Sequence, residues 1–204
     1  MYKFGAAARK IRLTLTGVVI TAEGIILSQP QLHHSGSHPW SIPGNGFYTL
    51  DLPWGRLGVI VGEDSIYPEV AKVLAMRGVD VIAIPFEAQE AWEIRLGLAG
   101  RSAENRVCLA AATRPRAFGD SMIIDQWRDF QIFTPWVGRE FSGTINDPIV
   151  YRAPHEPGIF IREVHPETAR FKMMSYQTDL LAGRPWMLTG PIFAESNPHW
   201  VEGG

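Results

Sequence analysis

The sequence predicts a mixed α/β domain built around one strand–helix–strand unit. Residues 57–61 and 79–84 are unbroken apolar runs rich in β-branched side chains, the pattern of strands that are covered on both faces. Between them, Pro68 suits the first turn of a helix, and Gly78 suits the left-handed residue just past its end. The two strands should therefore lie parallel. Chemistry in such sheets usually sits at the carboxyl ends of the strands, here residues 62–65.

The composition is that of one compact domain. The 204 residues are 46% hydrophobic, which is enough for one core and too few to argue for two. The net charge of −2, without a long run of either sign, gives no reason to expect a nucleic-acid or membrane partner. The single cysteine, Cys108, rules out a disulfide framework and fits a reducing compartment. No run approaches the roughly 20 apolar residues of a membrane span, and the first ten residues lack the apolar centre of a secretory signal. A cytoplasmic protein without a cofactor is therefore expected.

Two strands are expected before the central unit. Residues 1–12 have no periodic pattern and form a lead-in. Residues 13–20 and 24–27 are predicted to pair as a hairpin that turns near Gly24. The segment 28–46 is rich in proline, glycine and serine and should be a loop.

After the central unit, helices and strands should continue to alternate. A helix is predicted over 88–105 and a buried strand over 107–112. The helix should pack through four residues at i, i+4, i+7 and i+11, namely Trp92, Leu96, Ala99 and Ala103. Further strands are expected at 121–124, 131–134 and 158–164, a long connection at 138–157, a helix at 166–181 and a tail at 191–204.

The central motif resembles a known family. The run from Pro43 to Glu69 is similar to the core signature of the nitrilase, or carbon–nitrogen hydrolase, superfamily, and its matching positions are Gly58, Asp64, Tyr67, Pro68 and Glu69. Four later stretches resemble further family motifs in the same order: 101–107, 119–125, 158–160 and 183–186. The resemblance covers about residues 13–190. It implies part of an α-β-β-α sandwich that lacks the amino-terminal third of the family domain and whose subunits pair through outer helices.

The resemblance also implies a catalytic centre, and its positions are changed here. Members of the family use a cysteine nucleophile, a glutamate base and a lysine that stabilises the charged intermediate. Gly62 stands where the cysteine is expected, and Gln29 stands where the lysine is expected. The base belongs to the amino-terminal third, which this chain is predicted to lack. No catalytic residue of the family is therefore expected to be intact.

The sequence accordingly favours a catalytically degenerate protein, a structural or regulatory subunit of an oligomer or hetero-complex. Its partner would be a second copy, or another chain that supplies the missing amino-terminal elements. One alternative is an active carbon–nitrogen hydrolase, of amidase or nitrilase type, whose site a partner completes or which is rebuilt around Glu63 and Ser65. Another is a non-catalytic binding module that keeps the pocket beside Gly62.

Individual residues allow competing interpretations. Asp64, Tyr67 and Glu104 are candidate pocket residues, although Asp64 more readily fixes the turn through hydrogen bonds. Glu104 is equally suited to an ion pair with Arg101 that orients the end of a helix. Cys108 lies inside an apolar strand, where a thiol behaves as a small hydrophobe rather than as a nucleophile.

A histidine-rich loop raises the question of a metal. His33, His34 and His38 are close in sequence, but Pro39 and the glycine–serine composition argue against a helix that would align them. No cysteine or acid flanks them. We therefore predict no metal site.

Overall fold

The computed structural model describes residues 13–34, 36–114, 120–126, 148–173 and 178–189. The chain divides into two compact units, residues 1–171 and 172–204, and both sheets belong to the first. No helix in the described ranges has the length and apolar character needed to cross a membrane.

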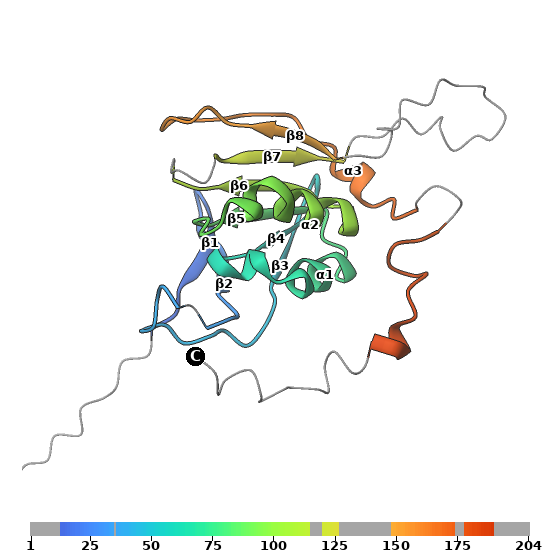
Figure 1. The fold of residues 1–204 in the computed structure, drawn as a ribbon, viewed down its shortest axis with the longest axis horizontal. Coiled ribbons are helices and arrows are strands. Elements are labelled where there is room, and N and C mark those ends of the chain that lie inside the picture. The colour runs from blue at the N-terminus through green and yellow to red at the C-terminus, as the bar shows by residue number, and fades with distance from the viewer. Residues whose placement is uncertain (1–12, 35, 115–119, 127–147, 174–177, 190–204) are drawn as a thin grey trace, which may run out of the picture. The chain divides into compact units, whose positions relative to one another are not determined.

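A six-stranded mixed sheet forms the centre of the first unit (Figure 1). Its strands, in spatial order, are β3 (Thr49–Leu52), β4 (Gly55–Val59), β5 (Val81–Pro85), β6 (Cys108–Ala112), β7 (Met122–Asp125) and β8 (Ile149–Arg152). The three central strands β4, β5 and β6 are parallel, and the register places Leu57 beside Val81 and Val81 beside Cys108. The outer strands β3, β7 and β8 are antiparallel to their neighbours. The predicted mixed α/β fold is confirmed.

The predicted strand–helix–strand unit is confirmed as β4, α1 (Pro68–Met76) and β5. Gly78 follows the helix with φ of +76°, the left-handed conformation that glycine adopts at little cost. A Cβ atom on Gly58 would lie 3.1 Å from a methyl carbon of Leu74, so the bare glycine allows α1 to sit directly on the sheet.

The second helix packs through a different face from the one predicted. It begins with a π-helical turn, η2 (Glu93–Gly97), and continues as α2 (Leu98–Asn105), which lies beside α1 (Figure 1). Two residues of the predicted apolar face are solvent-exposed, Trp92 by 43% and Leu96 by 71%. The buried face instead comprises Ile94, Leu98, Ser102 and Asn105. Its polar members make hydrogen bonds: Ser102 Oγ donates to the Val107 carbonyl at 2.7 Å, and Asn105 Nδ2 donates to the Arg101 carbonyl at 2.9 Å.

The opposite face of the sheet is covered by the predicted hairpin. Strands β1 (Thr16–Thr21) and β2 (Gly24–Pro30) pair antiparallel, so β2 runs further than the sequence indicated. A Cβ on Gly17 would lie 2.9 Å from methyl carbons of both Val59 and Val61, which shows how closely β1 approaches the sheet. Leu27 from β2 joins these two valines in one buried cluster.

The carboxyl-terminal predictions were largely wrong. Strand β8 lies within the stretch expected to be a connection, whereas residues 158–164 form no strand, and Ile159 and Ile161 are exposed by 92% and 75%. Because β8 already occupies the free edge of β7, the apolar run at 158–164 has no strand to pair with there. Of the described residues in the predicted helix over 166–181, only those of α3 (Pro166–Ala169) are helical. In the second unit a short 3₁₀ helix, η5 (Trp186–Thr189), is present. The strand expected at 131–134 lies outside the described residues.

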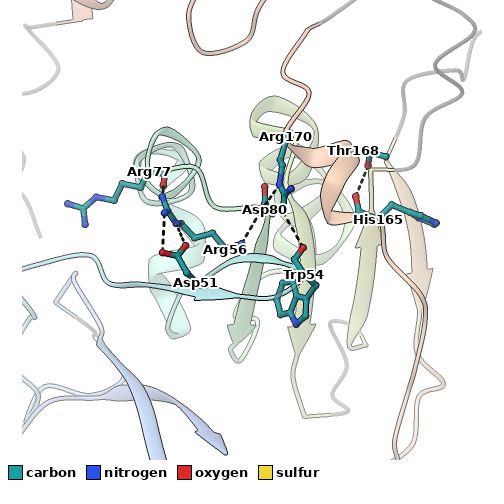
Figure 2. A network of polar contacts seen from close by, with 8 residues as sticks. All are labelled: Asp51, Trp54, Arg56, Arg77, Asp80, His165, Thr168 and Arg170. Carbon is teal, nitrogen blue, oxygen red and sulfur yellow. Dashed lines mark hydrogen bonds and ion pairs between the residues drawn. The ribbon is translucent and has the colours of Figure 1, made fainter.

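A polar network anchors the turn between β3 and β4 (Figure 2). The buried carboxylate of Asp80 accepts hydrogen bonds from the Arg56 backbone N–H at 2.9 Å and from Arg170 Nε at 3.2 Å. Gly55 in this turn has φ of +152°, and a Cβ there would lie 2.6 Å from Asp80 Oδ2. The Arg56 side chain donates to Asp51 at 2.6 Å and to the Arg77 carbonyl at 2.6 Å, which ties the turn to the end of α1.

Candidate functional site

The candidate site begins at the elbow where β4 leads into the 3₁₀ turn η1 (Gly62–Ile66). Gly62 has φ of +54°, a left-handed conformation in which most other residues are strained. Ser65 Oγ donates to the Gly62 carbonyl at 2.9 Å and closes the turn. The sequence therefore placed Gly62 correctly at the strand-to-helix elbow.

A cavity of about 900 Å³ opens at this elbow, within the size range of small-molecule sites. It lies at the carboxyl ends of β4, β5 and β6, with β1 forming one wall. Its lining consists of Leu15, Thr16, Gly17, Val18, Gln31, Ser37, His38, Val61, Gly62, Glu63, Pro85, Phe86, Glu87, Ala88, Gln89 and Arg114.

Gln31 is the polar side chain closest to the elbow glycine. It is only 2% exposed, and within the described part of the chain neither its amide nitrogen nor its amide oxygen has a hydrogen-bond partner. A Cβ on Gly62 would lie 3.6 Å from Gln31 Nε2. Gln31 was not among the predicted site residues, because the family resemblance points to Gln29 instead. The signal was present, since side chains two residues apart in an extended segment point to the same side.

The side chain of Gln29, in contrast, makes hydrogen bonds to the backbone. Its Nε2 donates to the carbonyls of Pro30 at 2.8 Å and Gly46 at 3.0 Å, and its Oε1 accepts the Tyr48 backbone N–H at 2.8 Å. The side chain is 1% exposed and does not line the cavity. Its amide is therefore used to hold the loop before β3 and not to face Gly62.

Asp64 fastens the elbow to the loop that follows β2. Its buried carboxylate accepts the backbone N–H groups of Leu32 at 2.7 Å and His33 at 2.9 Å, and it bonds His33 Nδ1 at 2.9 Å. The His33 ring stacks on Tyr67 with a centroid separation of 3.6 Å. These residues position Gln31, the neighbour of Leu32, against the cavity.

Glu63 joins three segments at the cavity mouth. Its Oε1 accepts hydrogen bonds from Ser37 Oγ and Gln89 Nε2, and the latter also donates to Ser37 Oγ at 3.1 Å. Together with Ser65, Glu63 was a candidate for a rebuilt catalytic centre. The Ser65 hydroxyl donates to a backbone carbonyl, and its described contacts include no base that would accept its proton.

The ion pair suggested by the sequence is present at the end of α2. Arg101 and Glu104 are 3.0 Å apart, and Arg101 also donates to the Ile66 carbonyl at 3.1 Å. Lys72 of α1 donates to the Glu104 backbone carbonyl at 3.0 Å. Glu104 does not line the elbow cavity; these contacts instead join both helices to η1.

Cys108 is fully buried on β6, and its thiol lies 3.5 Å from Asp125 Oδ1. Burial, with a smaller contribution from the charge of Asp125, raises the pKa of Cys108 to about 12, although backbone hydrogen bonds from Gln126 and His165 act in the opposite direction. The thiolate required of a nucleophile is therefore scarce at neutral pH.

The three loop histidines are not gathered around one point. His33 bonds Asp64, His38 meets Trp40 edge to face with centroids 5.6 Å apart, and His34 is exposed. Across the described ranges, no group of three or more histidine, cysteine, aspartate or glutamate side chains is arranged to hold a metal ion.

Two curated proteins illustrate what the chain is similar to. The deaminated glutathione amidase of Yersinia enterocolitica is 30% identical over 97 residues, which cover 42% of this chain and 33% of that protein. The omega-amidase NIT2 of Mus musculus is 28% identical over 97 residues, which cover 42% of this chain and 34% of that protein. The chain thus spans about a third of the length of the curated relatives it matches.

A solved structure and a family profile complete the comparison. Nit3 of Saccharomyces cerevisiae, a member of branch 10 of the nitrilase superfamily, matches with a TM-score of 0.49 and 20% identity, covering 56% of this chain and 46% of that one. The profile of the carbon-nitrogen hydrolase family matches residues 4–144, more than half of the chain. The chain belongs to the carbon-nitrogen hydrolase family, within the nitrilase superfamily.

Proposed function

We propose that this protein binds a small molecule through a carboxamide group in the elbow cavity and does not hydrolyse it. One observation carries the proposal. The elbow residue is Gly62, which has no side chain, and the side chain nearest to it is the buried Gln31, whose amide is unpartnered in the described part of the chain. These two features support a binding site that lacks the nucleophile of a hydrolase.

The lack of turnover follows from the chemistry of the candidate nucleophiles. Thiol-based hydrolysis requires a thiolate at the reacting carbon, and glycine supplies no atom beyond Cα. Cys108 is buried on β6 with a raised pKa. Losing the nucleophile alone lowered the rate by about 10⁶ in a well-studied hydrolase of another family.

The amide of Gln31 favours a carboxamide as its partner. Its nitrogen donates and its oxygen accepts, so a ligand group with one acceptor and one donor side by side satisfies both atoms. A carboxylate would meet the nitrogen but would leave two oxygens facing each other, and an amine would satisfy the oxygen alone. Because a buried amide without partners is costly, filling both positions is favoured.

Calorimetric titration with pentanamide and pentanoate, with ammonia release followed in parallel, tests the proposal. We expect pentanamide to bind, pentanoate to bind more weakly, and ammonia to stay at the background level. Gln31→Met should abolish pentanamide binding, whereas Glu69→Gln, a change on the exposed start of α1, should not. Steady ammonia release by the wild-type chain that is lost in Ser65→Ala would instead establish the alternative, a rebuilt hydrolase.

A second proposal concerns assembly. Trp92 and Leu96 project from the outer helices, and Ile20 and Ile25 from the hairpin, all with more than a third of their surface exposed. Such side chains favour a partner that covers them, either a second copy or another chain that completes the α-β-β-α sandwich. Light scattering on the purified protein tests this, and a stable soluble monomer would refute the subunit role.

A further inference from the structure

The apolar wall of the elbow cavity begins directly beside Gln31. A Cβ on Gly62 would meet two side chains first, the amide nitrogen of Gln31 at 3.6 Å and a methyl carbon of Leu15 at 3.9 Å. The backbone also joins these two residues, because the Gln31 N–H donates to the Leu15 carbonyl at 2.7 Å. A carboxamide held by Gln31 therefore has the methyl groups of Leu15 beside its next carbon atoms.

Strand β1 continues this wall. A Cβ on Gly17 would lie 2.9 Å from a methyl carbon of Val61 and 3.7 Å from the ring of Pro85. The backbone of β1 is thus close to aliphatic groups just after β4 and at the end of β5. These residues all line the cavity, as does Phe86, which is 8% exposed, and Val61 and Leu15 pack in one hydrophobic cluster. The part of the cavity next to the elbow therefore offers an apolar surface around one buried amide.

Polar groups at the cavity mouth already bind one another. Ser37 Oγ and Gln89 Nε2 both donate to Glu63 Oε1, and Gln89 Nε2 also donates to Ser37 Oγ at 3.1 Å. The charged residues Glu87 and Arg114 line the cavity too, but both are exposed to solvent. A polar group on the body of the ligand would compete with the bonds at the mouth or be buried against the apolar wall without a partner, which is costly. A hydrocarbon body has no such cost.

We propose that the ligand is an uncharged aliphatic carboxamide whose hydrocarbon body lies along Leu15, Val61 and Pro85. This inference rests on the proposed binding function, since it takes the carboxamide to be held by Gln31. The driving force is the removal of apolar surface, of the ligand and of the wall, from water. Each methylene group that becomes buried should tighten binding by about threefold to fourfold.

Primary carboxamides of increasing length test the inference: propanamide, pentanamide and heptanamide. Calorimetry should give dissociation constants that fall by about tenfold at each step along this series. The heat-capacity change of binding should become more negative along the series, because that change reports buried apolar surface. 4-Hydroxybutanamide carries a hydroxyl in place of the terminal methyl of pentanamide, and it should bind about tenfold more weakly than pentanamide.

The outcomes separate this inference from the proposed function. Equal affinities along the series, or equal binding of 4-hydroxybutanamide and pentanamide, would refute the apolar body and leave carboxamide binding by Gln31 standing. If none of the carboxamides binds, both the inference and the proposed function fail.

Variants of the wall locate the effect. Leu15→Ala should weaken the binding of pentanamide by about fivefold or more, and Val18→Thr, which keeps the shape of a lining side chain, should weaken that of heptanamide by about threefold. Val150→Thr makes the same replacement in β8, outside the cavity, and should leave both affinities unchanged. Affinities unaffected by the two wall variants, or weakened as much by Val150→Thr, would contradict the placement of the hydrocarbon body. Circular dichroism confirms that each variant is folded.

Discussion

Replacing Gln31 by methionine should leave the fold as stable as before or make it more stable, whereas the same replacement at Gln29 should destabilise it. The two glutamines are two residues apart at the end of β2, and both are almost fully buried. They differ in their hydrogen bonds. The amide of Gln31 has no partner among the described residues, and that of Gln29 makes three bonds to backbone groups.

The magnitudes follow from this difference. Each hydrogen bond of Gln29 contributes about 1 kcal/mol, and its loss leaves a backbone group without a partner, so Gln29→Met should cost about 2–4 kcal/mol of unfolding free energy. In Gln31 the penalty of an unsatisfied buried amide, about 1–3 kcal/mol, is present in the native protein. Methionine has a similar length and no such penalty. Gln31→Met should therefore change the unfolding free energy by between about 0 and +2 kcal/mol.

Urea unfolding monitored by tryptophan fluorescence measures both changes in unfolding free energy. A shift of the urea midpoint reports stability when the dependence of the unfolding free energy on urea concentration is the same in variant and wild type. The protein without any ligand is the appropriate sample, because a bound carboxamide would add stability to the wild type alone. If the two variants lose the same unfolding free energy, the side-chain amide of Gln31 is as well hydrogen-bonded as that of Gln29. The reasoning that makes Gln31 a ligand-binding group is then refuted.

Three other regions give measurable expectations. Asp64→Ala removes the acceptor of three hydrogen bonds at the elbow and should cost about 2–4 kcal/mol in urea unfolding, and a loss below 0.5 kcal/mol would contradict the role assigned to this carboxylate. Cys108 should resist alkylation by iodoacetamide in the folded protein from about pH 7 to 9 and react once urea unfolds it, so rapid labelling of native protein would disprove its burial. Since the pKa of this thiol is raised from 9.0 to about 12, its contribution to stability is complete below about pH 9 and is lost as the pH rises toward 12. Leu98→Ala should lower the unfolding free energy by about 2–4 kcal/mol because Leu98 is buried, whereas Leu96→Ala should change it by less than about 0.5 kcal/mol. A larger loss in Leu96→Ala than in Leu98→Ala would mean that the helix packs through the face predicted from the sequence.

The central unit was predictable because its signals are local. Pro68 and Gly78 mark the two ends of α1, and the flanking runs contain the residues that buried parallel strands require. The packed face of α2 was not predictable in this way. Ser102 is buried because hydrogen bonds satisfy it, and its partners are Val107 and Gln126, a residue that follows β7. No periodicity within the helix contains that information.

The carboxyl-terminal errors have a similar origin. Ile159 and Ile161 lie in a stretch with the composition of a strand, but strand formation also needs a partner edge. Strand β8 occupies the edge of β7, and a competition between distant segments is not visible in either segment alone. At the site, the spacing of the family motif located Gly62. Gln31 was missed although it lies two residues from Gln29 in an extended segment, and the structure places its side-chain nitrogen 3.6 Å from where a Cβ of Gly62 would lie.

The contact between Asp80 and Arg170 has a consequence for the order in which the chain acquires its structure. The two residues are 90 positions apart in the sequence. A ribosome that adds about 5–20 residues per second therefore synthesises Arg170 about 5–20 s after Asp80. Strands β4 to β6 and the elbow are complete in sequence before then. We therefore expect a nascent chain to assemble the elbow first and the turn at Gly55 last, when the arriving arginine fixes it (Figure 2).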